Sequence, residues 1–99
     1  MVSEWQPGTL RFTGHALRQM FARRISAAVV RAAVEQGETI ADYPGDRPHP
    51  SRLLLAYVDD RPIHVVLGYN QAQDTGYVIT AYEPDPAIWR PGFKERRQP

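Results

Sequence analysis

A histidine and an arginine one helical turn apart, His15 and Arg18, are the pair in this sequence best suited to proton transfer on a phosphate. An imidazole titrates near neutral pH, so it can take or give a proton, and a guanidinium can stabilise phosphate charge. A structural interpretation competes with this one, because both residues are also ordinary side chains of a solvated helix. The pair is therefore a candidate catalytic site.

A second set of polar residues lies in the alternating segments 63–69 and 76–82. If these segments pair as an antiparallel hairpin, His64 lies close to Tyr82 or Thr80, and an imidazole, a phenol and a hydroxyl share one sheet face. A phenol beside a histidine can orient or protonate a leaving group. Strand propensity and cross-strand packing explain the same residues without any function.

Cations that could contact a polyanion occur in two places, at Arg23 and Arg24 and again at Lys94, Arg96 and Arg97. They would form a shallow RNA-binding surface with exposed aromatic side chains such as Trp5, Trp89 or Phe93. The helix dipole explains the first pair equally well, because it favours cations at a helix end. With 12 Lys and Arg against 11 Asp and Glu, the net charge is only +1, so bulk charge does not indicate a nucleic-acid partner.

Composition excludes several function classes. The sequence has no cysteine, which removes disulfides, thiolate nucleophiles, and zinc or iron–sulfur sites built on cysteine. Its 3 histidines have no metal-binding spacing, so we expect no metal and no cofactor. No apolar run approaches the roughly 18 residues of a membrane span, and we expect a cytoplasmic protein with no membrane partner.

Two helices are predicted ahead of the strands. Thr13 suits the N-cap of a helix over 14–23, and Ser26 suits the N-cap of a helix over 27–36 that ends at Gly37. These helices would carry the first set of candidate residues.

The first helix is amphipathic. Its apolar residues recur at helical spacing and should form one stripe against the core, made of Ala16, Leu17, Met20 and Phe21. His15 and Arg18 fall on the opposite side and are expected to face solvent.

Strands are predicted over 51–58, 63–69 and 76–82, while 38–43 begins to alternate and 10–13 is a short strand or an extended lead-in. Helices followed by a meander indicate the α+β class, with two N-terminal helices packed on a three- to four-stranded, mainly antiparallel sheet. Alternation places one set of side chains under the helices, namely Ile63, Val65, Leu67, Tyr77, Ile79 and Ala81.

No internal repeat or linker divides the chain into two cores. We expect one domain over residues 10–90. An N-terminal extension of residues 1–9 precedes it, and a basic tail of residues 91–99 follows it on the surface.

Four separated motifs follow one another in this sequence. They are His-Ala-Leu-Arg-Gln-Met-Phe-Ala-Arg-Arg-Ile-Ser at 15–26, Gly-Glu-Thr-Ile-Ala-Asp-Tyr-Pro at 37–44, Pro-Ile-His-Val-Val at 62–66 and Tyr-Val-Ile-Thr-Ala-Tyr-Glu-Pro at 77–84. Together they resemble a small bacterial family, the domain of unknown function 4258, over roughly residues 10–90. The resemblance implies a fold similar to that of RelE/ParE-like toxins, with two helices on an antiparallel sheet.

The family pattern also implies site residues. Carried over position by position, it marks His15, Arg18, His64, Thr80 and Tyr82. It further marks an arginine ahead of the Ile-Ser junction, and this position is filled by either Arg23 or Arg24.

The polar candidates and the resemblance lead to one hypothesis, a toxin-type, metal-independent endoribonuclease of a bacterial toxin–antitoxin pair that cleaves RNA by 2′-hydroxyl attack. In this hypothesis the catalytic residues are His15, Arg18, His64 and Tyr82, and the RNA-binding residues are Arg23, Arg24, Thr80, Lys94, Arg96 and Arg97. The alternative is a non-catalytic module on the same fold that binds RNA, a ribosome or a protein partner such as a small antitoxin.

Overall fold

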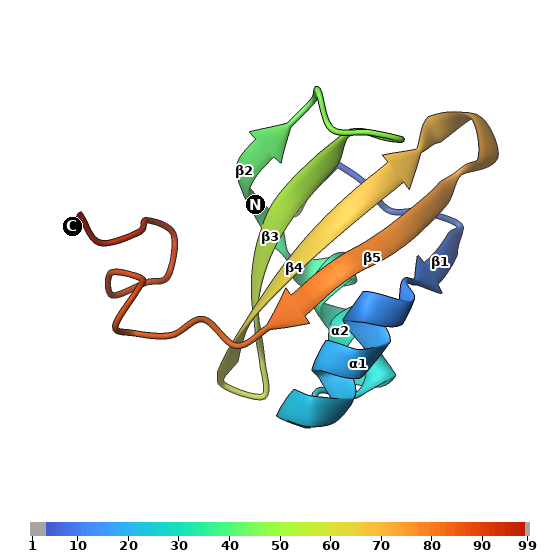
Figure 1. Ribbon diagram of the computed structural model, residues 1–99. Coiled ribbons are helices and arrows are strands. Elements are labelled where there is room, and N and C mark those ends of the chain that lie inside the picture. The colour runs from blue at the N-terminus through green and yellow to red at the C-terminus, as the bar shows by residue number, and fades with distance from the viewer. Residues whose placement is uncertain (1–3, 99) are drawn as a thin grey trace.

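The computed structural model describes residues 4–98, so residues 1–3 of the expected N-terminal extension and residue 99 of the expected tail lie outside the described residues. The elements follow one another as β1 (Thr9–Phe12), α1 (Gly14–Arg23), α2 (Ala27–Gln36), β2 (Glu38–Tyr43), β3 (Ser51–Val58), β4 (Arg61–Asn70), a 3₁₀ turn (Gln71–Gln73) and β5 (Thr75–Tyr82) (Figure 1). The α+β class and both helix ranges are as predicted. Within the described part of the chain, neither helix is long and apolar enough to cross a membrane.

The strands form one mixed sheet of 5 strands in the order β1-β5-β4-β3-β2. β1 pairs in parallel with β5, whereas all other neighbours are antiparallel. The expected sheet had three to four mainly antiparallel strands. The observed sheet is larger because β1 and β2 are both strands of it, one at each edge. β1 has only 4 residues, too few to show alternation, and its partner lies far along the chain, so no local pattern indicates the parallel pairing.

Capping side chains begin both helices. Thr13 and Ser26 each accept a hydrogen bond from the backbone N–H three residues on, at 3.1 Å, as predicted. At the end of α2, a Cβ on Gly37 would lie 2.5 Å from the carbonyl oxygen of Ala33. Glycine is thus required there by close packing, since its φ of −68° suits any residue.

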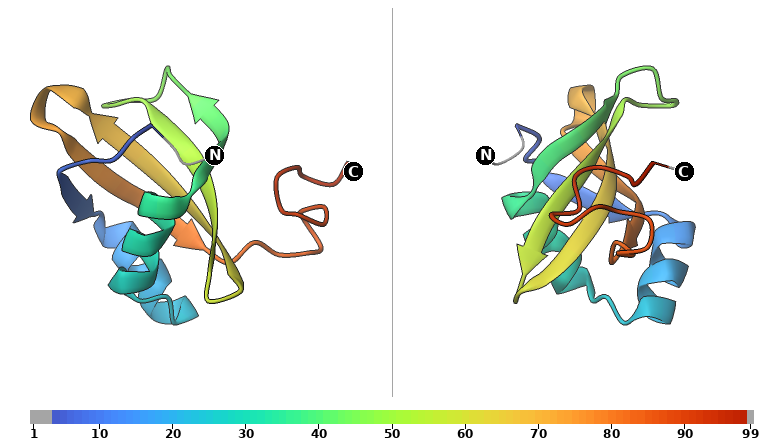
Figure 2. Two further views of the ribbon diagram at one scale, coloured as in Figure 1. Left: turned by 180° about the vertical axis from the view of Figure 1, so that it is seen from behind. Right: turned by 90° about the vertical axis from the view of Figure 1, so that its left-hand side faces the viewer.

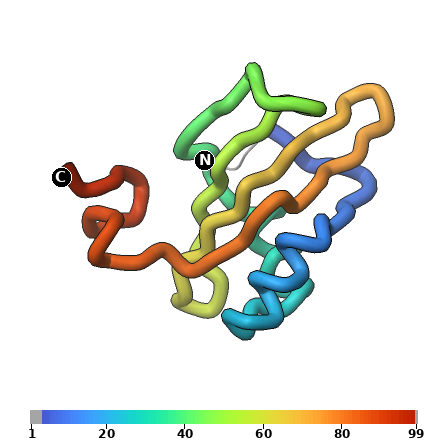
Figure 3. The backbone as a smooth tube through the Cα atoms, in the orientation of Figure 1, coloured from blue at the N-terminus to red at the C-terminus, as the bar shows by residue number. Residues whose placement is uncertain are grey.

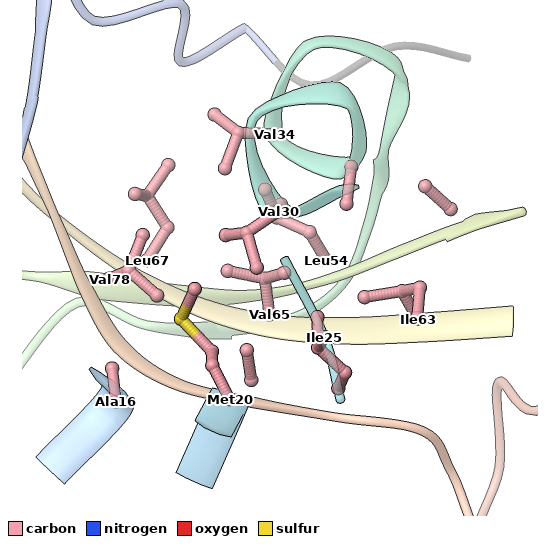
Figure 4. Close-up of a cluster of buried hydrophobic side chains, with 13 residues drawn as sticks. Ala16, Met20, Ile25, Val30, Val34, Leu54, Ile63, Val65, Leu67 and Val78 are labelled. Carbon is pink, nitrogen blue, oxygen red and sulfur yellow. The ribbon is translucent and has the colours of Figure 1, made fainter. Parts of the chain in front are cut away.

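Both helices pack on the same face of the sheet. α1 lies against β5, and α2 lies against β3 and β4 (Figure 2, left). The apolar side chains between the two layers form the core (Figure 4), which consists of Ala16, Met20, Ile25, Val30, Ala33, Val34, Leu54, Ala56, Ile63, Val65, Leu67, Val78 and Ala81. Their removal from water is the main stabilising contribution to this fold.

The orientation of α1 differs from the expected one. Ala16 and Met20 are buried, but Leu17 and Phe21 are 50% and 87% exposed, so half of the predicted apolar stripe is wrong. α1 is rotated about its axis so that Gln19 faces β5 in place of Leu17. The reason lies in β5.

A β-bulge interrupts β5 at Ile79, where the register with β4 shifts by one residue. The extra residue reverses the alternation on its N-terminal side, so Val78 is buried in the core and Ile79 is exposed. The expectation that Tyr77 and Ile79 lie under the helices is therefore wrong. Tyr77 instead stacks on the His49 ring, with centroids 5.5 Å apart.

Gln19 fills the irregularity in β5. Its side-chain oxygen accepts hydrogen bonds from the Thr80 hydroxyl and from the Ala81 N–H, the latter at 3.3 Å. These bonds tie α1 to the bulge, because backbone groups freed by a bulge need other partners.

Residues 84–98, here named the C-terminal arm, fold back over the outer face of the sheet, which is the face opposite the helices. Figure 3 shows the path of the arm from the end of β5, and Figure 2, right, shows it in front of β3 and β4. Trp89 and Arg96 form an antiparallel bridge within the arm, and Lys94 Nζ lies 3.0 Å from Glu38 Oε1 on β2. The cationic side chains of the expected tail are exposed, but its backbone is held in place.

Candidate functional site

His64 and Tyr82 are direct neighbours across β4 and β5. His64 Nδ1 and Tyr82 Oη are 3.2 Å apart, and the rings meet edge-on with centroids 5.2 Å apart. Because Ile63 and Val65 point into the core, alternation sends His64 to the outer face. The predicted proximity of this histidine and this tyrosine is confirmed.

The C-terminal arm seals His64, which is 0% exposed. The Trp89 ring lies edge-on to the imidazole with centroids 4.5 Å apart, and the Phe93 carbonyl oxygen lies 2.8 Å from Nε2. A carbonyl oxygen can only accept, so Nε2 carries the proton, Nδ1 of the neutral ring accepts, and the Tyr82 hydroxyl donates to it. Both ring nitrogens are therefore engaged.

Burial keeps both members of this pair uncharged at neutral pH. It lowers the pKa of His64 below 6.5, although the hydrogen bond to Phe93 opposes this shift. Burial also raises the pKa of Tyr82 above 10.0, against the opposing effects of Arg96 and Arg23. The two guanidinium groups therefore act electrostatically on the Tyr82 hydroxyl.

A groove of about 440 Å³ opens beside Tyr82, and we call it the C-terminal groove. Its lining comes from α1, β5 and the arm, with Gln19, Arg23, Thr80, Tyr82, Glu83, Asp85, Ile88, Trp89 and Arg96. Guanidinium, phenol and indole groups together suit a ligand that carries negative charge and flat rings. Its volume is within the range of small-molecule sites.

Among the described residues, two cations of the groove but only one of its acids lack an ion-pair partner. Glu83 is paired with Arg61 at 3.4 Å, and one oxygen of Asp85 accepts the N–H of Ala87 at 2.8 Å. Among residues 4–98, no ion pair includes Arg23 or Arg96. Arg96 does lie over the Trp89 ring, 5.3 Å from its centroid. The groove therefore favours anions.

The structure does not bring His15 and Arg18 into this groove. Both are exposed on α1 and absent from the groove lining. His15 is one turn before Gln19 on the same side of α1, about 6 Å along the helix axis. The expected convergence of His15 with His64 is not found, because the second histidine is sealed beneath the arm.

The predicted RNA-binding residues divide into two groups. Thr80, Arg23 and Arg96 line the groove, whereas Arg24, Lys94 and Arg97 do not. Arg24 ends α1 in a left-handed conformation, with a φ of 57°. Lys94 is paired with Glu38, and Arg97 Nε donates to the Pro86 carbonyl at 2.9 Å. Of the two arginines that the family pattern leaves open, Arg23 is the one in the groove. The functional roles of all these residues stay predictions.

Sequence reasoning missed Gln19 and Asp85 and misjudged Trp89. Gln19 had a signal, because it interrupts the side of α1 that carries Ala16 and Met20. Trp89 was expected to be exposed, yet it is 6% exposed, since its ring covers His64. Asp85 showed no signal beyond an ordinary turn position.

Among the described residues, no group of three or more histidine or acidic side chains is placed to hold a metal ion. No curated protein and no solved structure matches the chain. A family model, however, matches residues 12–83, from the end of β1 to the residue after β5. This match covers both helices, His64 and Tyr82, and leaves out the C-terminal arm from residue 84 onward. The chain belongs to the family described as Domain of unknown function (DUF4258).

Proposed function

We propose that the protein is a toxin-type, metal-independent endoribonuclease and that the C-terminal groove binds its RNA. The observation that carries this proposal is the Tyr82 phenol, held by His64 and influenced by the guanidinium groups of Arg23 and Arg96. Arginines that contact phosphate and aromatic rings that stack on bases are the two recurring elements of single-stranded RNA binding. At the groove, the Arg96 guanidinium lies over the buried Trp89 ring, so the flat guanidinium and the Tyr82 ring are the groups that could contact a base.

The proposed reaction is an internal displacement at phosphorus. The 2′-oxygen forms a bond to phosphorus and loses its proton, while the bond to the 5′-oxygen breaks and that oxygen gains a proton. Asp85 accepts the first proton in this proposal, because it lines the groove without an ion-pair partner among the described residues, whereas Glu83 is paired with Arg61. Arg23 and Arg96 stabilise the charge of the pentacoordinate phosphorus, and the Tyr82 hydroxyl donates its proton to the departing 5′-oxygen. After the product leaves, Asp85 loses its proton to water and Tyr82 regains one from water.

The test uses the purified protein, a single-stranded RNA and excess EDTA. We expect fragments that end in a 2′,3′-cyclic phosphate and begin with a 5′-hydroxyl. Tyr82→Phe should lower the cleavage rate by about 100-fold, the usual contribution of one positioned proton donor. Tyr57→Phe is the matched control, because Tyr57 is exposed on β3 outside the groove. Intact RNA across pH 5–9, or equal rates for the two variants, would refute the proposal.

A small antitoxin is the partner that this function requires. We propose that it carries acidic side chains and covers the groove, since Arg23 and Arg96 make the groove favourable to anions. Expression of the chain alone should slow growth of the host cells. Expression of Tyr82→Phe should not, if cleavage causes the effect.

Binding without cleavage is the second candidate. It is favoured by the position of His15 outside the groove and by the engagement of both nitrogens of His64, which leave no histidine free to act on RNA there. A binding module would retain RNA with an affinity that falls steeply with salt, and no product would form. Arg23→Gln should then weaken binding and reduce the slope of log affinity against log salt.

A further inference from the structure

The proton of the Tyr82 hydroxyl points away from the groove. The Phe93 carbonyl accepts from His64 Nε2, so Nδ1 of the neutral imidazole has only a lone pair to offer. The Tyr82 hydroxyl has a single proton, and it is donated to that lone pair at 3.2 Å. Tyr82 therefore presents only lone pairs to the groove in the ligand-free protein.

This direction is unfavourable for an anion. A phosphate oxygen is a hydrogen-bond acceptor, and it needs a donor from Tyr82 where the free protein offers another acceptor. If the hydroxyl turned toward the phosphate, Nδ1 of His64 would face the phenol oxygen with lone pairs on both sides. Such a buried unsatisfied acceptor is costly, and water is excluded from His64 by Trp89 and Phe93.

We infer that His64 is a positioning residue for Tyr82, and that binding of a phosphodiester in the C-terminal groove is coupled to uptake of a proton by His64. With a proton on each nitrogen, His64 still donates to the Phe93 carbonyl and now also donates to Tyr82. The phenol proton is then free to turn into the groove and bond to the phosphate. This inference rests on the groove being the anion site of the proposed function.

The groups around the pair are compatible with the added charge. The charged and titratable side chains that line the groove, pair with its residues or act on Tyr82 are Arg23 on α1, Glu38 and Tyr43 on β2, Arg61 on β4, Glu83 after β5, and Asp85, Lys94 and Arg96 in the arm. Glu38 is paired with Lys94, and Glu83 with Arg61. Burial disfavours a positive His64 in the free protein. A phosphate bound beside Tyr82 brings a negative charge close to the pair and an acceptor for the phenol proton. Both favour a protonated His64, which is the physical basis of the coupling.

The experiment measures proton uptake on binding. The probe is a single-stranded oligodeoxynucleotide, because its phosphodiesters keep one charge between pH 5 and pH 8 and it has no 2′-hydroxyl to react. Calorimetric titrations near pH 7 in two buffers of different ionisation enthalpy give the number of protons taken up. We expect the wild-type protein to take up more protons than Tyr82→Phe, with a difference approaching about one. Its affinity should correspondingly rise by up to about tenfold per pH unit toward lower pH.

Tyr82→Phe is the decisive variant, because it keeps His64, His15 and His49 and removes only the hydroxyl. Its residual pH dependence measures the background from the two exposed or loop histidines. His49→Gln is the matched control and should retain the full coupling, since His49 stacks on Tyr77 outside the groove. Imidazole nitrogen shifts by NMR supply an independent readout on folded wild-type protein. They should show His64 protonated at Nε2 alone when free and at both nitrogens when bound.

The outcomes separate this inference from the proposed function. Equal proton uptake by the wild-type protein and Tyr82→Phe, or a His64 that stays neutral in the complex, would overturn the inference even if RNA is cleaved. Coupled uptake with the oligodeoxynucleotide, together with intact RNA, would support the inference and refute the nuclease. Absence of any binding at low salt would overturn both.

Discussion

The indole of Trp89 stands perpendicular to the imidazole of His64, with ring centroids 4.5 Å apart and an interplanar angle of 90°. This edge-on contact joins the C-terminal arm to the centre of the sheet. Such aromatic contacts are worth about 1 kcal/mol beyond the area they bury. The same contact shields the histidine from water and so determines how it titrates.

Trp89→Ala should therefore change both stability and titration. We expect the free energy of unfolding to fall by about 3 kcal/mol, the usual cost of losing a large buried aromatic ring. The pKa of His64 should rise toward its ordinary value of 6.5, because burial is the main cause of its depression. Urea denaturation and NMR titration of the imidazole measure the two effects. Ile88→Ala, at a half-exposed neighbour, should shift neither by much, and an unchanged pKa in Trp89→Ala would contradict the shielding role.

Stability should fall on mild acidification. The folded protein holds His64 with a pKa below 6.5, so the unfolded chain binds more protons once the pH drops under that value. The stabilisation is complete above about pH 6.5 and is lost as the pH falls toward the folded pKa. Urea denaturation at intervals between pH 8 and pH 5 measures the slope. His64→Gln keeps an amide that can donate to the Phe93 carbonyl but does not titrate, so stability should depend less on pH in this variant. An equal slope in both proteins would show that His64 is not the group responsible.

Truncation of two adjacent residues of α1 should change the free energy of unfolding by very different amounts. Met20→Ala is expected to lower the free energy of unfolding by about 3 kcal/mol, because Met20 is 4% exposed and its loss leaves a cavity. Phe21→Ser should change it by less than about 0.5 kcal/mol, since Phe21 is 87% exposed. Thermal and urea denaturation compare the two variants. Comparable losses of stability would show that Phe21 also packs against the core, as expected from the sequence.

Gln19 should contribute more to the free energy of unfolding than a polar residue on a helix surface usually does. Gln19→Ala removes the acceptor of the Thr80 hydroxyl and the Ala81 N–H at the bulge. We expect a loss of about 1–2 kcal/mol, because both donors then lack their partner. Gln36→Ala, at the exposed end of α2, is the matched control. Denaturation curves that coincide for the two variants would show that water replaces Gln19 without cost.

Local chemistry was enough to predict the helices and to indicate the neighbours of His64. The caps at Thr13 and Ser26 and the packed glycine at the end of α2 are decided by neighbours in the chain, and they were correct. Alternation and an expected hairpin placed His64 close to Tyr82 or Thr80, and the structure pairs it with Tyr82. This pair depends on the bulge, because the register of the hairpin turn, Asn70 opposite Thr75, would place Ala81 opposite His64 without the extra residue. Short-range rules therefore indicated the right neighbours but not the irregularity that brings them together.

The remaining features depend on contacts between distant segments. The rotation of α1 follows from the bulge at Ile79, which has no signature in its own residues. The cover over His64 follows from Trp89 finding an apolar surface on the outer face of the sheet. Neither the rotation of α1 against β5 nor the position of the C-terminal arm can be predicted from hydrophobic periodicity. These two features determine which of the predicted residues lie together in the C-terminal groove.

The arm also sets an order of events during synthesis. All five strands precede residues 84–98 in the chain, so the whole sheet is synthesised before the arm that covers it. The sheet can therefore assemble while His64 is still open to solvent and one wall of the groove is missing. The proposed activity would then begin only once Trp89 docks, because Asp85 and Arg96 reach the groove with the arm.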